Sequence, residues 1–174
     1  MSKNKCIFLD RDGVLNKDFV DYAYSLDKFF IIDGVAEALD LLKKHGYLLI
    51  VITNQSGLAR GIYTREDMQL CHNYLQENTG HLIDHIYYSP CHPNFSESLT
   101  RKPGTLMFEK AIAKFDVDVT QSWMVGDKLR DMQPAIKMGI KTIQVDGHDD
   151  KIADHVAENL LGAAQFILSS DKRV

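Results

Sequence analysis

Cysteine, long apolar runs and an excess of basic residues are all scarce or missing in this sequence of 174 residues. The three cysteines, Cys6, Cys71 and Cys91, are too few and odd in number for a disulfide framework, so they indicate reduced thiols. No stretch approaches the roughly 18 apolar residues of a membrane span, and the N-terminus has no apolar run of signal-peptide length. We therefore predict a cytoplasmic protein that has no membrane partner.

The charge balance argues against a general nucleic-acid binder. Lys and Arg total 20 against 24 Asp and Glu, a formal net charge of −4, whereas nucleic-acid binding normally needs a basic face. A local basic cluster can still hold a small phosphorylated molecule. Hydrophobic residues make up 45% and charged residues 25%, which is typical of a soluble globular protein. The length suits one domain, which we expect to span residues 1–174.

Short apolar runs alternate with helical patterns along the chain. Strands are predicted over residues 5–10, 47–54, 85–89, 122–127, 141–145 and 164–168. Helices are predicted over residues 34–46, 64–80, 104–115 and 132–139. We expect Thr64 to cap the second helix and Asp131 to cap the fourth, with Pro134 in the first turn of the fourth. This alternation predicts an α/β fold: a Rossmann-like, open and mostly parallel sheet with helices on both faces.

Polar side chains follow several of the predicted strands. Ligands in such folds bind beyond the carboxyl ends of the strands. The residues at these ends are Asp10, Asp12, Thr53, Asn54, Asp127 and Lys128, with Arg101 and Lys102 in the long loop after residues 85–89. Their convergence on one edge, rather than any single residue, indicates a site.

Asp10 and Asp12 belong to the run FLDRDGVLN. Two carboxylates so close repel each other unless a cation or a shared proton relieves them, and Mg²⁺ prefers oxygen ligands. One carboxylate is then able to attack phosphorus while the other handles the proton of the leaving group. Alone, such a run is as often a plain turn. Asp127 can complete the acidic pocket, with Asp131 behind it or as a helix cap.

Lys102 and Lys128 would supply positive charge against a phosphoryl group, and Thr53 and Asn54 can hold its oxygens. Lone lysines are usually solvated and a lone T-N pair is usually a turn. These residues therefore gain meaning only from their setting beside the acidic pair.

Four motifs, in order, resemble the haloacid dehalogenase phosphohydrolase superfamily: D-x-D-G at 10–13, T-N at 53–54, RKP at 101–103 and GD at 126–127. The resemblance covers residues 7 to about 146, and it implies an Mg²⁺-dependent phosphatase that passes through a phosphoaspartate. The roles that it implies are nucleophile for Asp10, general acid and base for Asp12, phosphoryl binding for Thr53 and Lys102, and Mg²⁺ binding for Asp10, Asp127 and the backbone carbonyl of Asp12.

Within this superfamily, FLDRDGVLN, FIDGV, TNQSGLARG and VGDKLRDM look like the small, capless heptose bisphosphate phosphatases, which are related to histidinol-phosphate phosphatases. This likeness implies removal of the 7-phosphate of D-glycero-D-manno-heptose 1,7-bisphosphate, with histidinol phosphate or another small phosphomonoester as the alternative. Arg60 and Arg101 would then grip the distal phosphate, since a guanidinium binds phosphate bidentately. Only about 18 residues separate Leu15 from Gly34, too few for a folded cap domain.

Relatives of this kind usually bind a structural Zn²⁺ in the loop before RKP. The matching positions here are Ser89, Cys91, Ser98 and Thr100, with His92 nearby. Structural zinc normally needs four Cys or His ligands, so we predict that this chain binds no zinc.

Three alternatives remain open from the sequence. The chain would be a phosphatase for another small phosphomonoester, a phosphotransferase to a sugar hydroxyl, or a catalytically silent binding subunit. The last is disfavoured, because a silent relative has no need of Asp10, Asp12, Lys102 and Asp127 together. We expect a monomer whose partner is a small phosphorylated sugar.

Overall fold

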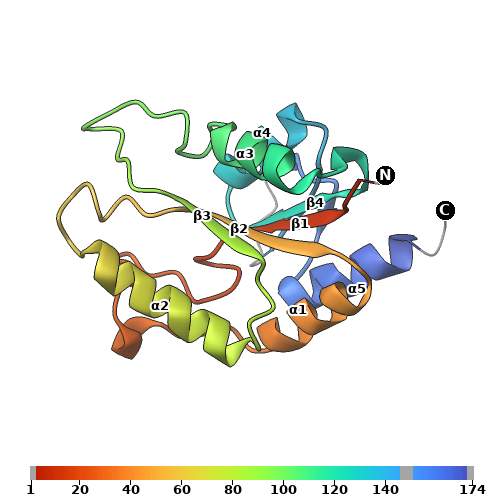
Figure 1. Ribbon diagram of the computed structural model, residues 1–174, viewed down its shortest axis with the longest axis horizontal. Helices are drawn as coiled ribbons and strands as arrows, with labels where there is room; N and C mark the ends of the chain where they lie inside the picture. Colours follow the sequence, from red (N-terminus) through yellow and green to blue (C-terminus); the bar gives the residue numbers. More distant parts are fainter. Residues whose placement is uncertain (1–2, 146–150, 172–174) are drawn as a thin grey trace.

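The computed structural model describes residues 3–145 and 151–171, which form one six-stranded sheet with helices on both faces (Figure 1). The strands are β1 (Cys6–Leu9), β2 (Leu48–Asn54), β3 (His85–Ser89), β4 (Trp123–Gly126), β5 (Lys141–Gln144) and β6 (His155–Val156). The helices are α1 (Val35–Lys44), α2 (Arg65–Asn78), α3 (Leu106–Phe115), α4 (Leu129–Lys137) and α5 (Leu160–Asp171), with short 3-10 turns at Leu26–Lys28 and Val119–Gln121. The predicted α/β fold is confirmed.

Alternate residues of the central strands supply two hydrophobic cores, because successive side chains of a strand point to opposite faces. Ile7 and Leu9 of β1 pack with the buried sides of α1, α2 and α5. Cys6 and Phe8 pack with those of α3 and α4. Figure 1 shows these two helical layers on opposite sides of the sheet.

The strand order β3-β2-β1-β4-β5-β6 places a topological switch point between β1 and β4. Every pair of neighbouring strands is parallel, and Leu9 lies in register with Val51 on one side and Val125 on the other. The chain winds outward in both directions from β1 and β4, and in open α/β sheets ligands bind in the crevice outside the carboxyl ends of such strands. Asp10 and Asp127 immediately follow these two strands, and the fold therefore brings them together.

Helix α2 begins as its sequence predicts. The Thr64 side chain accepts a hydrogen bond from the backbone N–H of Asp67 at 3.1 Å, and the Asp67 carboxylate accepts one from the Thr64 N–H at 2.8 Å. This reciprocal pair confirms Thr64 as the N-cap.

The strand predicted at 164–168 is wrong, because this segment lies inside α5. Leu160, Ala163, Ala164 and Ile167 are buried at helical spacing, i, i+3, i+4 and i+7. A short apolar run cannot distinguish a strand from a buried helix by itself. The sixth strand is instead the two-residue pairing of β6 with β5.

Helix α4 starts earlier than predicted. Lys128 is its N-cap, so Asp131 is the third helical residue and Pro134 lies beyond the first turn. The Asp131 carboxylate still serves the helix start by accepting a hydrogen bond from the Lys128 N–H at 3.1 Å.

The segment between β1 and α1 carries no folded cap, as predicted: its regular structure is the three-residue turn Leu26–Lys28. Two of its aromatic side chains, Tyr22 and Tyr24, pack on Tyr63 with ring centroids 5.9 and 5.3 Å away. In the described part of the chain, no helix has the length and apolar character to cross a bilayer.

Candidate active site

Lys102 binds two buried carboxylates at once. Its Nζ lies 2.8 Å from Asp10 Oδ1 and 2.6 Å from Asp131 Oδ1, and it donates to the Ile52 carbonyl at 2.6 Å. All three charged side chains are almost completely out of contact with solvent. Burying charge is costly unless it is paired, so each member of this cluster depends on the others. The cluster joins the loop after β3 to the carboxyl end of β1 and the amino end of α4.

The surroundings of Asp10 destabilise its ionised form. Burial, followed by the nearby Asp131 carboxylate, raises the pKa of Asp10 to about 6, although Lys102 acts in the opposite direction. Burial, followed by Asp10, also raises the pKa of Asp127. Additional positive charge is therefore favoured in this crevice.

Asp10, Asp127 and Asp131 form a cluster suited to a divalent cation. One carboxylate oxygen from each lies within 4.8 Å of the others. Asp127 Oδ1 is buried without a hydrogen-bond partner among the described residues, which fits a metal ligand. Gly13 makes room for this group: at φ +88°, a Cβ there would approach Asp127 Oδ2 to 2.4 Å. Carboxylate oxygens are the ligands that Mg²⁺ prefers, so the residues present fit this ion.

Asp12 is held by donors on every side. Its Oδ1 accepts from Arg11 Nη2 at 2.8 Å and from Asn16 Nδ2 at 2.9 Å, and its Oδ2 accepts from Gln55 Nε2 at 3.0 Å. Burial acts to raise the pKa of Asp12, but Arg11 and the other donors outweigh it and the pKa is lowered. Asp12 is therefore an oriented, ionised carboxylate beside Asp10.

The sequence interpretation missed Arg11 and the residues that hold it. Arg11 is 1% exposed, and its Nη1 lies 3.3 Å from His72 Nε2. Because an arginine nitrogen can only donate, His72 Nε2 must accept, and the ring is neutral. Burial, followed by Arg11, lowers the pKa of His72 to about 3, in agreement with this tautomer. His72 thus completes the setting of Asp12 from the buried face of α2.

Gln55, also missed, links Asp12 to Thr53. Tyr63 donates to Gln55 Oε1 at 2.7 Å, which leaves Gln55 Nε2 free to donate to Asp12 and, at 3.0 Å, to Thr53 Oγ1. The predicted Thr53 is therefore buried beside the acidic pair at the end of β2.

Asn54 contacts backbone rather than open space. Its Oδ1 accepts from the Lys102 N–H at 2.9 Å, and its Nδ2 donates to the Lys102 carbonyl at 3.1 Å. The Asn54 amide therefore positions the backbone of Lys102, and its predicted contact with substrate stays a prediction.

Lys128 is paired with acidic side chains. Its Nζ contacts Asp18 and lies 3.2 Å from Asp127 Oδ2. It borders the acidic cluster as predicted, with part of its charge already balanced by Asp18.

Arg60 and Arg101 lie on the loops that follow β2 and β3. Arg60 Nη1 donates to the Tyr22 hydroxyl at 3.0 Å, and Arg101 Nη1 donates to the Cys91 carbonyl at 3.0 Å. Neither guanidinium forms an ion pair with a carboxylate in the described part of the chain. Both therefore remain available to an anion.

Hydroxyl groups bind one another at the base of the 89–104 loop. Thr100 Oγ1 lies 2.9 Å from Ser89 Oγ and 2.8 Å from Ser98 Oγ. These are three of the positions where the resemblance leads one to expect zinc-binding thiolates. The mutual hydrogen bonds close the loop base without a metal.

Metal analysis of the purified protein should accordingly find no stoichiometric zinc. Neutral hydroxyls are poor zinc ligands, and Cys91 with His92 offers two of the four ligands that a structural site needs. The measurement is elemental analysis after dialysis against metal-free buffer. One zinc per chain would contradict the prediction.

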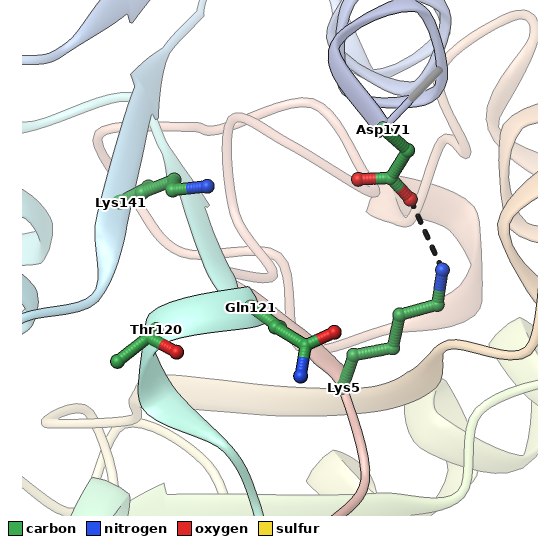
Figure 2. A pocket seen from close by; sticks show the side chains of 5 residues that line it. All are labelled: Lys5, Thr120, Gln121, Lys141 and Asp171. Atoms are coloured by element: carbon green, nitrogen blue, oxygen red, sulfur yellow. Dashed lines mark hydrogen bonds and ion pairs between the residues drawn. The ribbon is translucent and has the colours of Figure 1, made fainter. Parts of the chain in front are cut away.

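A separate hollow of about 470 Å³ lies at the amino ends of β1, β4 and β5 and is lined by Lys5, Thr120, Gln121, Lys141 and Asp171. Figure 2 shows these side chains around it, with Lys5 paired to Asp171 at 3.0 Å. None of the residues described above lines it.

The acidic crevice at the switch point, with its buried lysine and Mg²⁺-suited carboxylates, defines a phosphoryl-transfer enzyme of the kind that uses an aspartate. Comparisons agree with this class. Residues 14–145 match the haloacid dehalogenase-like hydrolase family. The D-glycero-D-manno-heptose-1,7-bisphosphate 7-phosphatase of Chlorobaculum tepidum is 37% identical over 186 residues, which cover 94% of each chain.

Two further relatives agree. The D-glycero-beta-D-manno-heptose-1,7-bisphosphate 7-phosphatase of Photorhabdus laumondii is 41% identical and covers 89% of this chain and 88% of its own. The crystal structure of D,D-heptose 1,7-bisphosphate phosphatase from B. bronchiseptica, complexed with magnesium and phosphate, superposes with a TM-score of 0.87 at 29% identity, covering 95% of this chain and 99% of its own. The chain therefore belongs to the haloacid dehalogenase-like hydrolases, in the family of the heptose-1,7-bisphosphate 7-phosphatases.

Proposed function

We propose that this chain is an Mg²⁺-dependent phosphatase that removes the 7-phosphate of D-glycero-D-manno-heptose 1,7-bisphosphate. The observation that carries the chemistry is the buried Asp10, held by Lys102 beside the carboxylates of Asp127 and Asp131. The substrate rests on relatives that match nearly the whole chain and carry this activity in their names.

In this proposal Asp10 attacks phosphorus, the bond from phosphorus to the sugar oxygen breaks, and a phosphoaspartate forms. Asp12 gives a proton to the leaving oxygen and later takes one from the water that hydrolyses the intermediate. Asp12 is ionised at rest, so we assign its proton to the bound state, in which the negative phosphoryl group beside it raises its pKa.

Lys102 and the Thr53 hydroxyl would hold the transferring phosphoryl oxygens. Mg²⁺, held by Asp10, Asp127 and the backbone carbonyl of Asp12, would neutralise charge on these oxygens. Asp131 acts through Lys102, because its carboxylate fixes the ammonium group at 2.6 Å.

Arg60 and Arg101 would bind the phosphate that is not removed, since both guanidinium groups lie at the mouth without a carboxylate partner among the described residues. Lys128 would contact the sugar or its phosphate. Asn54 positions Lys102 through its amide, and substrate binding by Asn54 stays a prediction. A single domain over 1–174, a monomeric state and a cytoplasmic location stay predictions. The buried, unpaired thiols of Cys6 and Cys71 support a reducing compartment.

The experiment that tests this function is phosphate release with Mg²⁺ across a panel. The panel holds both anomers of the heptose 1,7-bisphosphate, histidinol phosphate and simple sugar phosphates, because named relatives include enzymes for either anomer. We expect one heptose anomer to be preferred by about 100-fold in kcat/KM, roughly 2.7 kcal/mol of transition-state discrimination. Flat, weak turnover would keep the chemistry and reject the heptose substrate.

A further inference from the structure

Arg130 lies beside the catalytic crevice, on the second helical residue of α4. It lines a hollow of about 590 Å³ together with Arg101, Lys102 and residues of the 93–104 loop. Lys102 turns its ammonium group inward to Asp10 from the same stretch of loop. The hollow is therefore adjacent to the phosphoryl site but distinct from it.

The two arginines that line this hollow have no carboxylate partner in the part of the chain that the structure describes. Arg130 Nε is buried and has no hydrogen-bond partner among the described residues. Within the same described ranges, neither Arg130 nor Arg101 forms an ion pair, although Glu97 also lines the hollow. A buried donor left without an acceptor is costly, and native structures seldom tolerate one without a reason.

The two guanidinium groups also act on each other. Burial, followed by the charge of Arg130, lowers the pKa of Arg101 below its usual value. Two like charges that line one hollow and form no ion pair among the described residues favour an anion that can bridge both. The start of α4 adds the partial positive charge of a helix N-terminus on the same side.

We propose that Arg130, together with Arg101, binds the retained phosphate of a bisphosphate substrate and makes the enzyme prefer bisphosphates to monophosphates. This inference rests on the proposed function and adds a specificity residue to it. Oxygen atoms of a phosphate would accept from the buried Nε of Arg130 and from the guanidinium of Arg101, and they would relieve both the unpaired donor and the repulsion.

The test compares each variant on two matched substrates, the heptose 1,7-bisphosphate and the heptose 7-phosphate that lacks the second phosphate. Arg130→Gln should lower kcat/KM for the bisphosphate by about 10- to 100-fold, the usual effect of losing a charged hydrogen bond, mainly through KM. For the monophosphate, kcat/KM should fall by less than about threefold, because Arg130 does not touch the reacting group.

Lys137→Gln is the matched control, because it removes the same charge from an exposed position at the other end of α4. It should leave kcat/KM unchanged for both substrates. Arg130→Lys keeps the charge without the planar guanidinium, so its kcat/KM for the bisphosphate should lie between those of wild type and Arg130→Gln. Equal losses on both substrates, or no loss on either, would overturn the inference; circular dichroism and the melting temperature confirm that each variant folds.

Failure of the proposed function gives a different result. If the wild-type enzyme hydrolyses p-nitrophenyl phosphate but neither heptose compound, the heptose substrate is rejected. The same comparison is then made with fructose 1,6-bisphosphate and fructose 6-phosphate. A bisphosphate preference that Arg130→Gln abolishes would still support the inference, and the absence of any such preference in the wild type would reject it.

Discussion

Asp10→Asn should abolish phosphate release while the protein stays folded. Asparagine has the shape of aspartate but offers no carboxylate to attack phosphorus, so kcat should fall by on the order of 10⁴-fold or more. Lys102 at 2.8 Å and the Arg11 N–H at 2.7 Å can both still donate to the asparagine oxygen. The local hydrogen bonds therefore survive the change.

The stability of this variant provides a second readout. Because burial raises the pKa of Asp10 to about 6, above its usual 3.8, the folded protein binds this proton more tightly than the unfolded chain does. The ionised carboxylate therefore lowers the free energy of unfolding progressively as pH rises from about 4 through 6. In the absence of Mg²⁺, Asp10→Asn should remove this loss, so the variant should be relatively more stable at pH 8 than at pH 4.

Asp33→Asn is the matched control, since Asp33 is an exposed aspartate at the start of the α1 region. It should leave turnover and the pH dependence of urea unfolding unchanged. Turnover by Asp10→Asn within tenfold of wild type would exclude the phosphoaspartate pathway.

The fold was predictable where local pattern and environment agree. Strands at 5–10, 47–54 and 85–89 are apolar runs that end in polar residues, and the structure places β1, β2 and β3 there. The segment 164–168 misled because a five-residue apolar run fits either a strand or a buried helix, and the helical spacing becomes clear only from Leu160 onward.

The site was predictable as far as it follows strand ends. Asp10 and Asp127 come together because β1 and β4 are neighbours, a consequence of the alternating pattern. Arg11 was missed because it stands at the unspecified position of the D-x-D-G pattern, and the pattern alone does not show that its side chain is buried. Its partner His72 could have been found from its spacing: it lies four residues after Met68 and three before Leu75, which places it on the apolar face of α2.

The rest of the site depends on contacts between residues far apart in the sequence. The part that Asp131 plays depends on Lys102, 29 positions earlier in the sequence, and no spacing rule joins a loop after β3 to the first turn of α4. Nor does the sequence indicate that the Asn54 amide binds the backbone of Lys102, 48 positions later, in addition to the substrate contact predicted for it. The sequence indicates the polar groups at the strand ends more readily than the groups that hold them in place.

Lys102→Met should damage both stability and turnover, because it leaves Asp10 and Asp131 buried without their cation. Removing one member of a buried ion pair typically costs about 3–5 kcal/mol. Asp10 can take up a proton in compensation, so its already raised pKa should rise further and the loss of stability should be larger at pH 8 than at pH 5. The measurement is urea unfolding at both pH values without Mg²⁺.

Turnover should also fall by at least about 10²- to 10³-fold, because a preorganised donor to the phosphoryl group is gone. Lys110→Met, an exposed lysine on α3, is the control and should change neither property. A stability loss no larger than that of the control would show that the ion pairs contribute nothing to folding.

The double variant Lys102→Met with Asp131→Asn separates the two effects. Neutralising Asp131 removes one of the unpaired buried charges, so stability should recover in part relative to Lys102→Met alone. Turnover should not recover, because the phosphoryl group still lacks its lysine. Recovery of both together would mean that Lys102 acts only by neutralising Asp131, and the phosphoryl-binding role would then pass to another cation at the crevice.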